Sequence, residues 1–193
     1  MVQSPIRFTS IEDYAALDPA DLPAGNYELI NGAIVEMGAE SDVNLEIASF
    51  LFSCLLQFVP YYLLRRGTEV AVSSQSVTSR YPDLVVLTEE TRHAMQREKR
   101  SLIGLDIPAP RLVIEVVSPG SENRDRDYIQ KRQEYAVRGI PEYWLIDPER
   151  SLVAVLQLKD GRYQETQFRG ADPVRSGTFP GLQVMAQQIL DAN

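Results

Sequence analysis

Residues 111–117 restrict the fold more than any other segment, because they give the strongest strand signal in the chain. Their order is Arg-Leu-Val-Ile-Glu-Val-Val, and Ser118-Pro119-Gly120 ends the run. A short run of branched apolar residues closed by turn residues is typical of a buried strand. Glu115 lies inside this run, and a buried carboxylate is costly unless it is paired or bound to a metal ion. The segment therefore predicts both a sheet core and a candidate site.

The rest of the chain predicts an α/β architecture. Asn31-Gly32 and Asp160-Gly161 each separate two strand-like runs, and such dipeptides favour two-residue β-hairpin turns. Helices are expected at residues 42–58, 88–100 and 122–138, with a short helix within 8–23. Strands besides the one at 111–117 are expected at residues 61–64, 69–72, 83–87 and 141–147. Residues 182–190 are expected to form a last strand or a short helix. We expect a mixed central β-sheet flanked by helices, with an N-terminal hairpin and a C-terminal β-hairpin, in a single domain over residues 1–193.

Composition fits a globular protein of a reducing compartment. The chain has 193 residues, of which 44% are hydrophobic, and this suffices for one domain with a substantial core. Cys54 is the single cysteine, so no intrachain disulfide and no cysteine-based zinc site is expected. The most apolar window, residues 47–59, is shorter than the roughly 20 residues that a membrane-spanning helix needs. We expect a cytoplasmic protein with no signal peptide and no membrane contact.

The charge pattern limits how such a chain can bind nucleic acid. The net charge is −8, which argues against binding nucleic acid by bulk positive charge. Basic residues gather in three places, namely Arg65-Arg66, residues 97–100, and the trio Arg124, Arg126 and Arg132. They are expected either to flank a phosphate groove or to form a salt-bridged surface. Gly-rich nucleotide-binding motifs of the GxGxxG or GxxxxGK[ST] type are absent from the sequence.

Chemistry-bearing residues converge on the Glu115 strand. Asp83 follows Pro82 and opens an apolar strand. Asp127, Lys131 and Tyr135 recur at intervals of four, which places them on one face of a helix that returns from the Glu115 strand. Two carboxylates, with help from a backbone carbonyl such as that of Val116, are hard oxygen ligands that suit Mg²⁺ or Mn²⁺. A neighbouring lysine would stabilise charge on a phosphoryl oxygen or orient the attacking water. This set predicts phosphodiester hydrolysis.

With these residues in view, the sequence resembles the PD-(D/E)XK nuclease superfamily, and within it the Uma-type putative restriction endonuclease family. The matching segments occur in the same order as in that family and span about residues 27–182. They are Tyr27-Glu28-Leu29-Ile30-Asn31-Gly32, Tyr81-Pro82-Asp83-Leu84-Val85-Val86, Ile114-Glu115-Val116-Val117-Ser118-Pro119, the set Asp127, Lys131, Tyr135 and Gly139, and Glu142-Tyr143-Trp144-Leu145-Ile146-Asp147-Pro148. The resemblance implies a restriction-endonuclease-like core.

The resemblance also implies a function and its residues. It implies a Mg²⁺-dependent endonuclease, with Mn²⁺ as a substitute, that acts on nucleic acid, most simply DNA, as a homodimer. Asp83 and Glu115 would hold the metal ion, and Lys131 would assist the attacking water or the transition state. Glu28 would be a further acidic catalytic residue, with Glu46 as its rival.

The chain departs from the superfamily pattern at two positions. Val117 occupies the usual lysine position two residues after Glu115, which makes Lys131 the substitute. Asn44 stands where many relatives have histidine. These departures and the acidic composition leave two alternatives open: a catalytically inactive nuclease-fold binding or regulatory module, and a phosphoesterase for a smaller substrate. Asp127 is expected to brace Lys131 rather than to bind metal.

Overall fold

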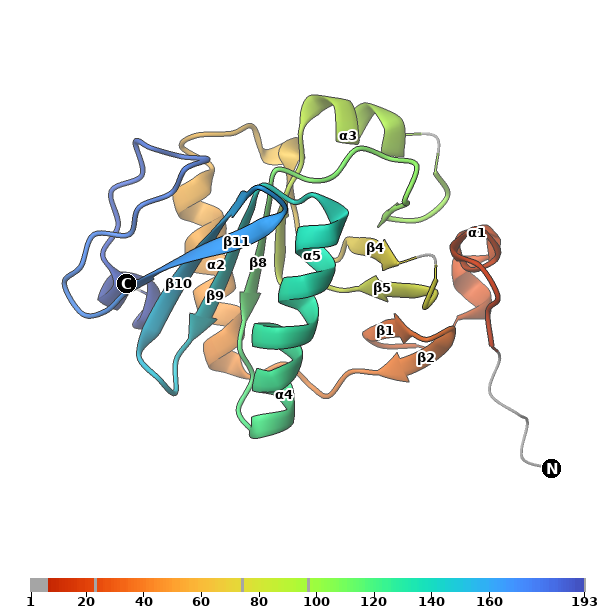
Figure 1. Ribbon diagram of the computed structural model, residues 1–193, viewed down its shortest axis with the longest axis horizontal. Helices are drawn as coiled ribbons and strands as arrows, with labels where there is room; N and C mark the ends of the chain where they lie inside the picture. Colours follow the sequence, from red (N-terminus) through yellow and green to blue (C-terminus); the bar gives the residue numbers. More distant parts are fainter. Residues whose placement is uncertain (1–6, 23, 74, 97, 193) are drawn as a thin grey trace.

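The computed structural model describes residues 7–22, 24–73, 75–96 and 98–192, and its strands form two mixed sheets (Figure 1). The strands of the first sheet are, in spatial order, β2 (Ala33–Glu36), β1 (Tyr27–Ile30), β5 (Thr78–Arg80), β4 (Glu69–Ser73) and β7 (Leu102–Ile103). Those of the second are β11 (Arg162–Phe168), β10 (Leu152–Lys159), β9 (Glu142–Asp147), β8 (Leu112–Val116), β6 (Leu84–Val86) and β3 (Leu64–Arg65). The single central sheet expected from the sequence is thus the second sheet, and a smaller sheet stands beside it.

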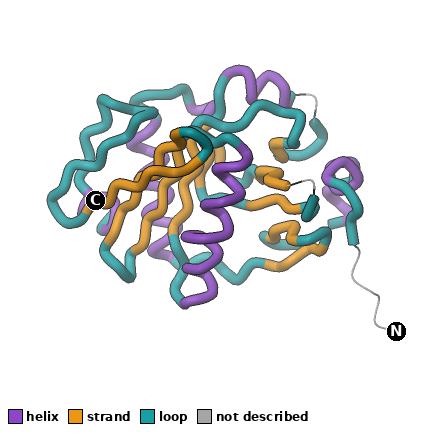
Figure 2. Tube along the Cα trace, in the orientation of Figure 1, coloured by secondary structure: helices purple, strands orange, loops and turns teal. Residues whose placement is uncertain are grey.

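Helices cover both faces of the second sheet. In Figure 1, α2 (Asp42–Leu55) lies behind this sheet, and α4 (Ser121–Asp125) and α5 (Arg132–Arg138) lie in front of it. The shorter helices α1 (Ile11–Ala16), α3 (Glu89–Met95) and α6 (Ala186–Leu190) lie around the edges. Figure 2 shows the resulting order of helix, sheet and helix. In the described ranges, none of the helices has the length and apolarity that a membrane crossing requires.

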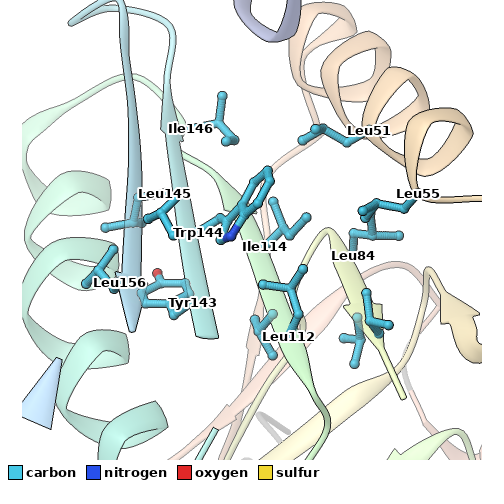
Figure 3. Packing of buried hydrophobic residues seen from close by; sticks show 14 of the residues in the cluster. Leu51, Leu55, Leu84, Leu112, Ile114, Tyr143, Trp144, Leu145, Ile146 and Leu156 are labelled. Carbon is cyan, nitrogen blue, oxygen red and sulfur yellow. The ribbon is translucent and has the colours of Figure 1, made fainter. Parts of the chain in front are cut away.

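The main core lies between α2 and the second sheet. Neighbouring side chains of a strand point to opposite faces, so Trp144 and its parallel partner Ile114 face Leu51 and Leu55 of α2, as Figure 3 shows. Glu115 is consequently turned toward the other face, where the helix after β8 packs. Strands β8 and β9 are buried along their whole length, which explains why they read as continuous apolar runs.

Both predicted hairpins are present. Asn31 and Gly32 have φ values of 51° and 74°, as a type I′ turn between β1 and β2 requires. Strands β10 and β11 pair on either side of Asp160-Gly161. The hydroxyl of Ser41 accepts a hydrogen bond from the backbone N–H of Asn44 at 3.2 Å and so caps α2 at its expected start.

Several expected boundaries are wrong. Residues 61–63 form a 3₁₀ turn before the short β3, because Pro60 supplies no N–H for a ladder and its φ of −59° starts a tight turn. Helix α3 ends at Met95 rather than at residue 100, and the chain then enters β7. The final segment is the short helix α6. The sequence analysis missed β5 and β7 altogether.

The helix expected at residues 122–138 has a wide turn in its middle. A π-helical segment, Arg126–Lys131, joins α4 to α5, and Gly139 ends the helix with a left-handed φ of 79°. A π turn accommodates an extra residue and is often found at functional sites. Here it carries Asp127 and Lys131.

Candidate active site

The ends of two neighbouring strands bring Asp83 and Glu115 to the same level. In the antiparallel pair of β6 and β8, Leu84 lies opposite Ile114, so the residue before Leu84 stands beside the residue after Ile114. Asp83 Oδ2 accepts a hydrogen bond of 2.6 Å from the backbone N–H of Val116. The two carboxylates are therefore fixed relative to each other by the sheet itself.

Lys131 reaches Glu115 from the π-helical segment Arg126–Lys131, which lies on the same side of the second sheet as α4 and α5 (Figure 1). Its side chain is fully buried, and Nζ lies 2.9 Å from Glu115 Oε2, 3.2 Å from Glu28 Oε1 and 3.3 Å from Asp127 Oδ1. One turn further on, Tyr135 donates a 2.7 Å hydrogen bond from its hydroxyl to Glu115 Oε1. The expectation that Lys131 and Tyr135 face Glu115 is confirmed, and Asp127 braces Lys131 as expected.

Glu28 joins the cluster from the first sheet. It lies on β1 and is 2% exposed. Besides Lys131, it accepts hydrogen bonds from Arg80 Nη1 at 2.8 Å and from the backbone N–H of Tyr81 at 3.4 Å. Its rival Glu46 is exposed on α2. The structure therefore brings together Glu28, Glu115 and Lys131, and leaves Glu46 apart from them.

Arg80 is a site residue that the sequence analysis missed. It is 2% exposed, and its guanidinium contacts Glu134 through two hydrogen bonds of 2.7 and 2.8 Å while it also holds Glu28. Paired N–H groups of this kind suit the geometry of a carboxylate. The one available signal was its position just before Tyr81-Pro82-Asp83. Arg80 thus fixes the acid that in turn contacts Lys131.

The buried charges shift one another's pKa values in opposite directions. Burial raises the pKa of Glu115 to about 7, although the Lys131 ammonium lowers it. Burial and the Glu115 charge raise the pKa of Asp83 well above its usual range. Burial also raises the pKa of Glu28, but Lys131 and Arg80 outweigh it and hold that pKa at about 2. The charged forms of Asp83 and Glu115 are therefore disfavoured together, and a cation bound beside them would lower both pKa values.

These residues line a cleft of about 680 Å³. Its other walls are the β1–β2 hairpin, the segment after it and the start of α2. The charged side chains that line it are Glu28, Glu36, Glu40, Arg66, Asp83, Glu115, Arg126 and Lys131. Asn44, on α2, is buried beside the cleft and donates to the backbone carbonyl of Val116 at 3.3 Å. The residue at the family's histidine position therefore braces the strand that carries Glu115.

The cleft offers the donors that a hard divalent cation prefers. Asp83, Glu115 and Val116 all line it, and carboxylate and carbonyl oxygens suit Mg²⁺. Across the described ranges, no three acidic, histidine or cysteine side chains are grouped so that they could hold an ion by themselves. Mg²⁺ commonly binds one or two carboxylates and keeps several waters. The residues present therefore fit an ion whose remaining positions are filled by water or substrate.

The other residues singled out from the sequence have structural places. Val117 is buried in the main core, so the usual lysine position packs against apolar neighbours. Trp144, from the last matching segment, is also core. Of the basic residues, Arg66 and Arg126 line the cleft. Several others pair with acids outside it, namely Arg100 with Glu69, Arg124 with Asp147 and Glu149, and Arg132 with Glu165. Arg97 lies outside the described residues.

Fold and cleft together define a nuclease-like α/β protein. The fold is similar to that in a crystal structure titled as a putative nuclease belonging to DUF820 from Anabaena variabilis ATCC 29413. The TM-score is 0.70 and the sequence identity 19%, over 95% of this chain and 98% of that chain. The family model Uma2, described as "Putative restriction endonuclease", matches residues 11–191. The chain belongs to this family, as the sequence resemblance implied. A search of curated proteins found no match.

Proposed function

We propose that this chain is a Mg²⁺-dependent endonuclease that hydrolyses phosphodiester bonds in DNA, with Mn²⁺ as a substitute ion. One observation carries the proposal: Lys131 Nζ lies 2.9 Å from Glu115 Oε2 in a cleft that Asp83 also lines. Membership of a restriction endonuclease family supports nuclease chemistry. The predictions of a cytoplasmic location and of a homodimer stay predictions.

The proposed roles follow from the contacts. Asp83, Glu115 and the Val116 carbonyl would hold the ion, which when bound polarises a phosphate and lowers the pKa of a water molecule. Tyr135 orients Glu115 through its hydrogen bond. Glu28 and Asp127 hold the Lys131 ammonium in place.

Lys131 has a specific constraint in this scheme. Its ammonium has three N–H donors, and three carboxylates lie within 3.3 Å of it. None of the three contacts has hydrogen-bond geometry, so a donation from Lys131 to a phosphoryl oxygen or to the attacking water exchanges an ion-pair contact and not a hydrogen bond. Charge stabilisation in a buried site needs no such exchange, because the effective dielectric constant there is low.

Metal binding is the first test. We would titrate Mg²⁺ and Mn²⁺ by calorimetry into the wild type, Asp83→Asn and Glu115→Gln, with and without a short DNA oligonucleotide, and measure cleavage in parallel. We expect the wild type to bind an ion and cleave, and both variants to fold but lose at least tenfold in ion affinity. Glu46→Gln, an exposed acid on α2, is the matched control. Unchanged ion affinity in Asp83→Asn contradicts the proposed metal site.

Two outcomes would favour other functions. If the wild type binds the oligonucleotide but no divalent ion, the chain is a nuclease-fold binding or regulatory module. If it hydrolyses a chromogenic phosphodiester and leaves DNA intact, it is a phosphoesterase for a smaller substrate.

A further inference from the structure

We infer that the cleft takes one unpaired nucleic-acid strand, and that Arg66 and Arg126 bind phosphates of this strand. The inference rests on the proposed function, since it specifies the substrate of the same cleft. It goes beyond the proposed function because a DNA endonuclease can act on paired or unpaired strands.

The size of the cleft favours a single strand. About 680 Å³ lies within the range of pockets that enclose one small organic molecule, and that is room for about one or two nucleotides. Glu115, at the wall of this cleft, is only 4% exposed. A duplex holds its phosphates on a rigid surface with the second strand close behind. A flexible single strand can bend its backbone to reach Glu115.

The charge of the residues that line the cleft also favours a single strand. The charged groups that line the cleft are five acidic residues and three basic ones, and Lys131 is already paired with carboxylates. Glu36 and Glu40 add negative charge on the hairpin side. A duplex carries one charge per roughly 1.7 Å of its axis, and a single strand about half that density. An acidic cleft therefore repels a duplex more strongly.

The two arginines have few close partners within the protein. Arg126 uses Nε to contact Asp127 Oδ1 at 3.2 Å, and its terminal nitrogens donate no hydrogen bond to any of the described residues. Within the part of the chain that the structure describes, the polar contacts of Arg66 are long, 3.8 Å to Glu40 Oε1 and 3.5 Å to the hydroxyl of Ser49. By contrast, Arg132 Nη1 lies 2.6 Å from Glu165 Oε2. Arg66 and Arg126 are thus the cleft arginines with capacity left for phosphate.

The test compares one DNA sequence in two forms. A fluorescein-labelled 12-nucleotide single strand and its blunt duplex are titrated with Asp83→Asn, which is used to prevent cleavage, and binding is followed by fluorescence anisotropy at several salt concentrations. We expect the strand to bind at least tenfold more tightly than the duplex. Two phosphate contacts predict a slope of log affinity against log salt of about −1.4 for the strand. Equal or tighter duplex binding overturns the inference.

Arginine variants in the same background test the contacts themselves. Arg66→Gln and Arg126→Gln should each reduce the magnitude of the slope by about 0.7. Arg92→Gln is the matched control, because Arg92 lies on α3 outside the cleft and pairs with Glu89 at a long 3.8 Å. If the two cleft variants keep the slope of the control, the assigned contacts are wrong.

Cleavage by the wild type in Mg²⁺ separates this inference from the proposed function. If the strand binds through both arginines but neither form is cut, the strand site stands and the nuclease proposal fails. If the duplex is cut as fast as the strand, the nuclease proposal stands and the inference is overturned.

Discussion

At the scale of single residues, the candidate site is a buried set of charges centred on Lys131. Its ammonium is fully buried and compensates Glu28, Glu115 and Asp127. A buried ion pair adds little stability by itself, but removing one partner leaves an uncompensated charge. A substitution of Lys131 therefore changes stability as well as any activity, and the two effects have to be measured separately.

We predict that Lys131→Met lowers the free energy of unfolding by about 3–5 kcal/mol, because three buried carboxylates lose their common cation. Adding Glu115→Gln to Lys131→Met should restore part of this loss, since one of those charges is then removed. Urea unfolding of the wild type and both variants measures the difference. A loss below about 1 kcal/mol would show that the carboxylates are not charged together in the folded protein.

Sequence reasoning reached the residues that are linked by local rules. The interval of four placed Asp127, Lys131 and Tyr135 on one helix face, and the contacts of Lys131 and Tyr135 with Glu115 followed from that face. Arg80 could not be found in this way. Its partners lie 52 and 54 residues away in the chain, and no periodicity describes a contact between separate elements.

At the scale of elements, the β1–β2 hairpin positions Glu28. Its turn packs against the preceding chain, where the backbone N–H of Phe8 donates to the Gly32 carbonyl at 2.8 Å. A Cβ at Gly32 would stand 2.3 Å from the Phe8 carbonyl oxygen. Gly161 has the same φ of 74° in the C-terminal hairpin, yet a Cβ there meets nothing within 4 Å. A substitution at Gly161 therefore tests backbone strain alone, whereas one at Gly32 tests the same strain together with a steric clash.

We predict that Gly161→Ala destabilises the protein by about 1–2 kcal/mol, the cost of a left-handed alanine. Gly32→Ala should cost more, because the chain near Phe8 must move, and it should also reduce cleavage by shifting Glu28. Thermal unfolding and cleavage assays of both variants provide the comparison. Equal destabilisation by the two substitutions would show that the close approach of Phe8 adds nothing to the free-energy cost at Gly32.

The elements that escaped prediction lack a local signature. Strand β5 is Thr78-Ser79-Arg80, a polar segment that is buried because Thr78, Ser79 and Arg80 find side-chain partners. Alternation of apolar and polar residues, the usual strand signal, is missing there. The π segment has the composition of an ordinary helix, so its wide turn was also unpredictable. Strand β7 has only two residues, too few for any pattern.

At the scale of the whole molecule, the site spans the two sheets. Glu28 belongs to the first sheet, Glu115 to the second, and Lys131 to the helical segment that contacts both. Arg138, at the end of α5, also reaches the first sheet through the backbone carbonyl of Ala71 at 3.1 Å. The stability of the molecule is therefore coupled to the charge state of the site.

This coupling predicts a pH dependence for Glu28. Its pKa of about 2 in the folded protein is below the ordinary value of 4.5, so its contribution is complete above about pH 4.5 and is lost as the pH falls toward 2. The contribution amounts to about 3 kcal/mol. We predict that Glu28→Gln unfolds with a flatter pH profile than the wild type between pH 4.5 and 2. Urea titrations across that window, with Glu46→Gln as the exposed control, measure it; parallel profiles for Glu28→Gln and the wild type would contradict it.

The wide sequence separation of these ion pairs has a consequence for when the candidate site forms during synthesis. Glu28, Arg80 and Lys131 meet only after the loops between them have closed, and loop closure over such distances is a slow step in folding. A growing chain that ends before Lys131 contains Glu28 and Glu115 but lacks the lysine that pairs with both. During synthesis, the candidate site therefore cannot form until Lys131 has left the ribosome and its segment has packed against both sheets.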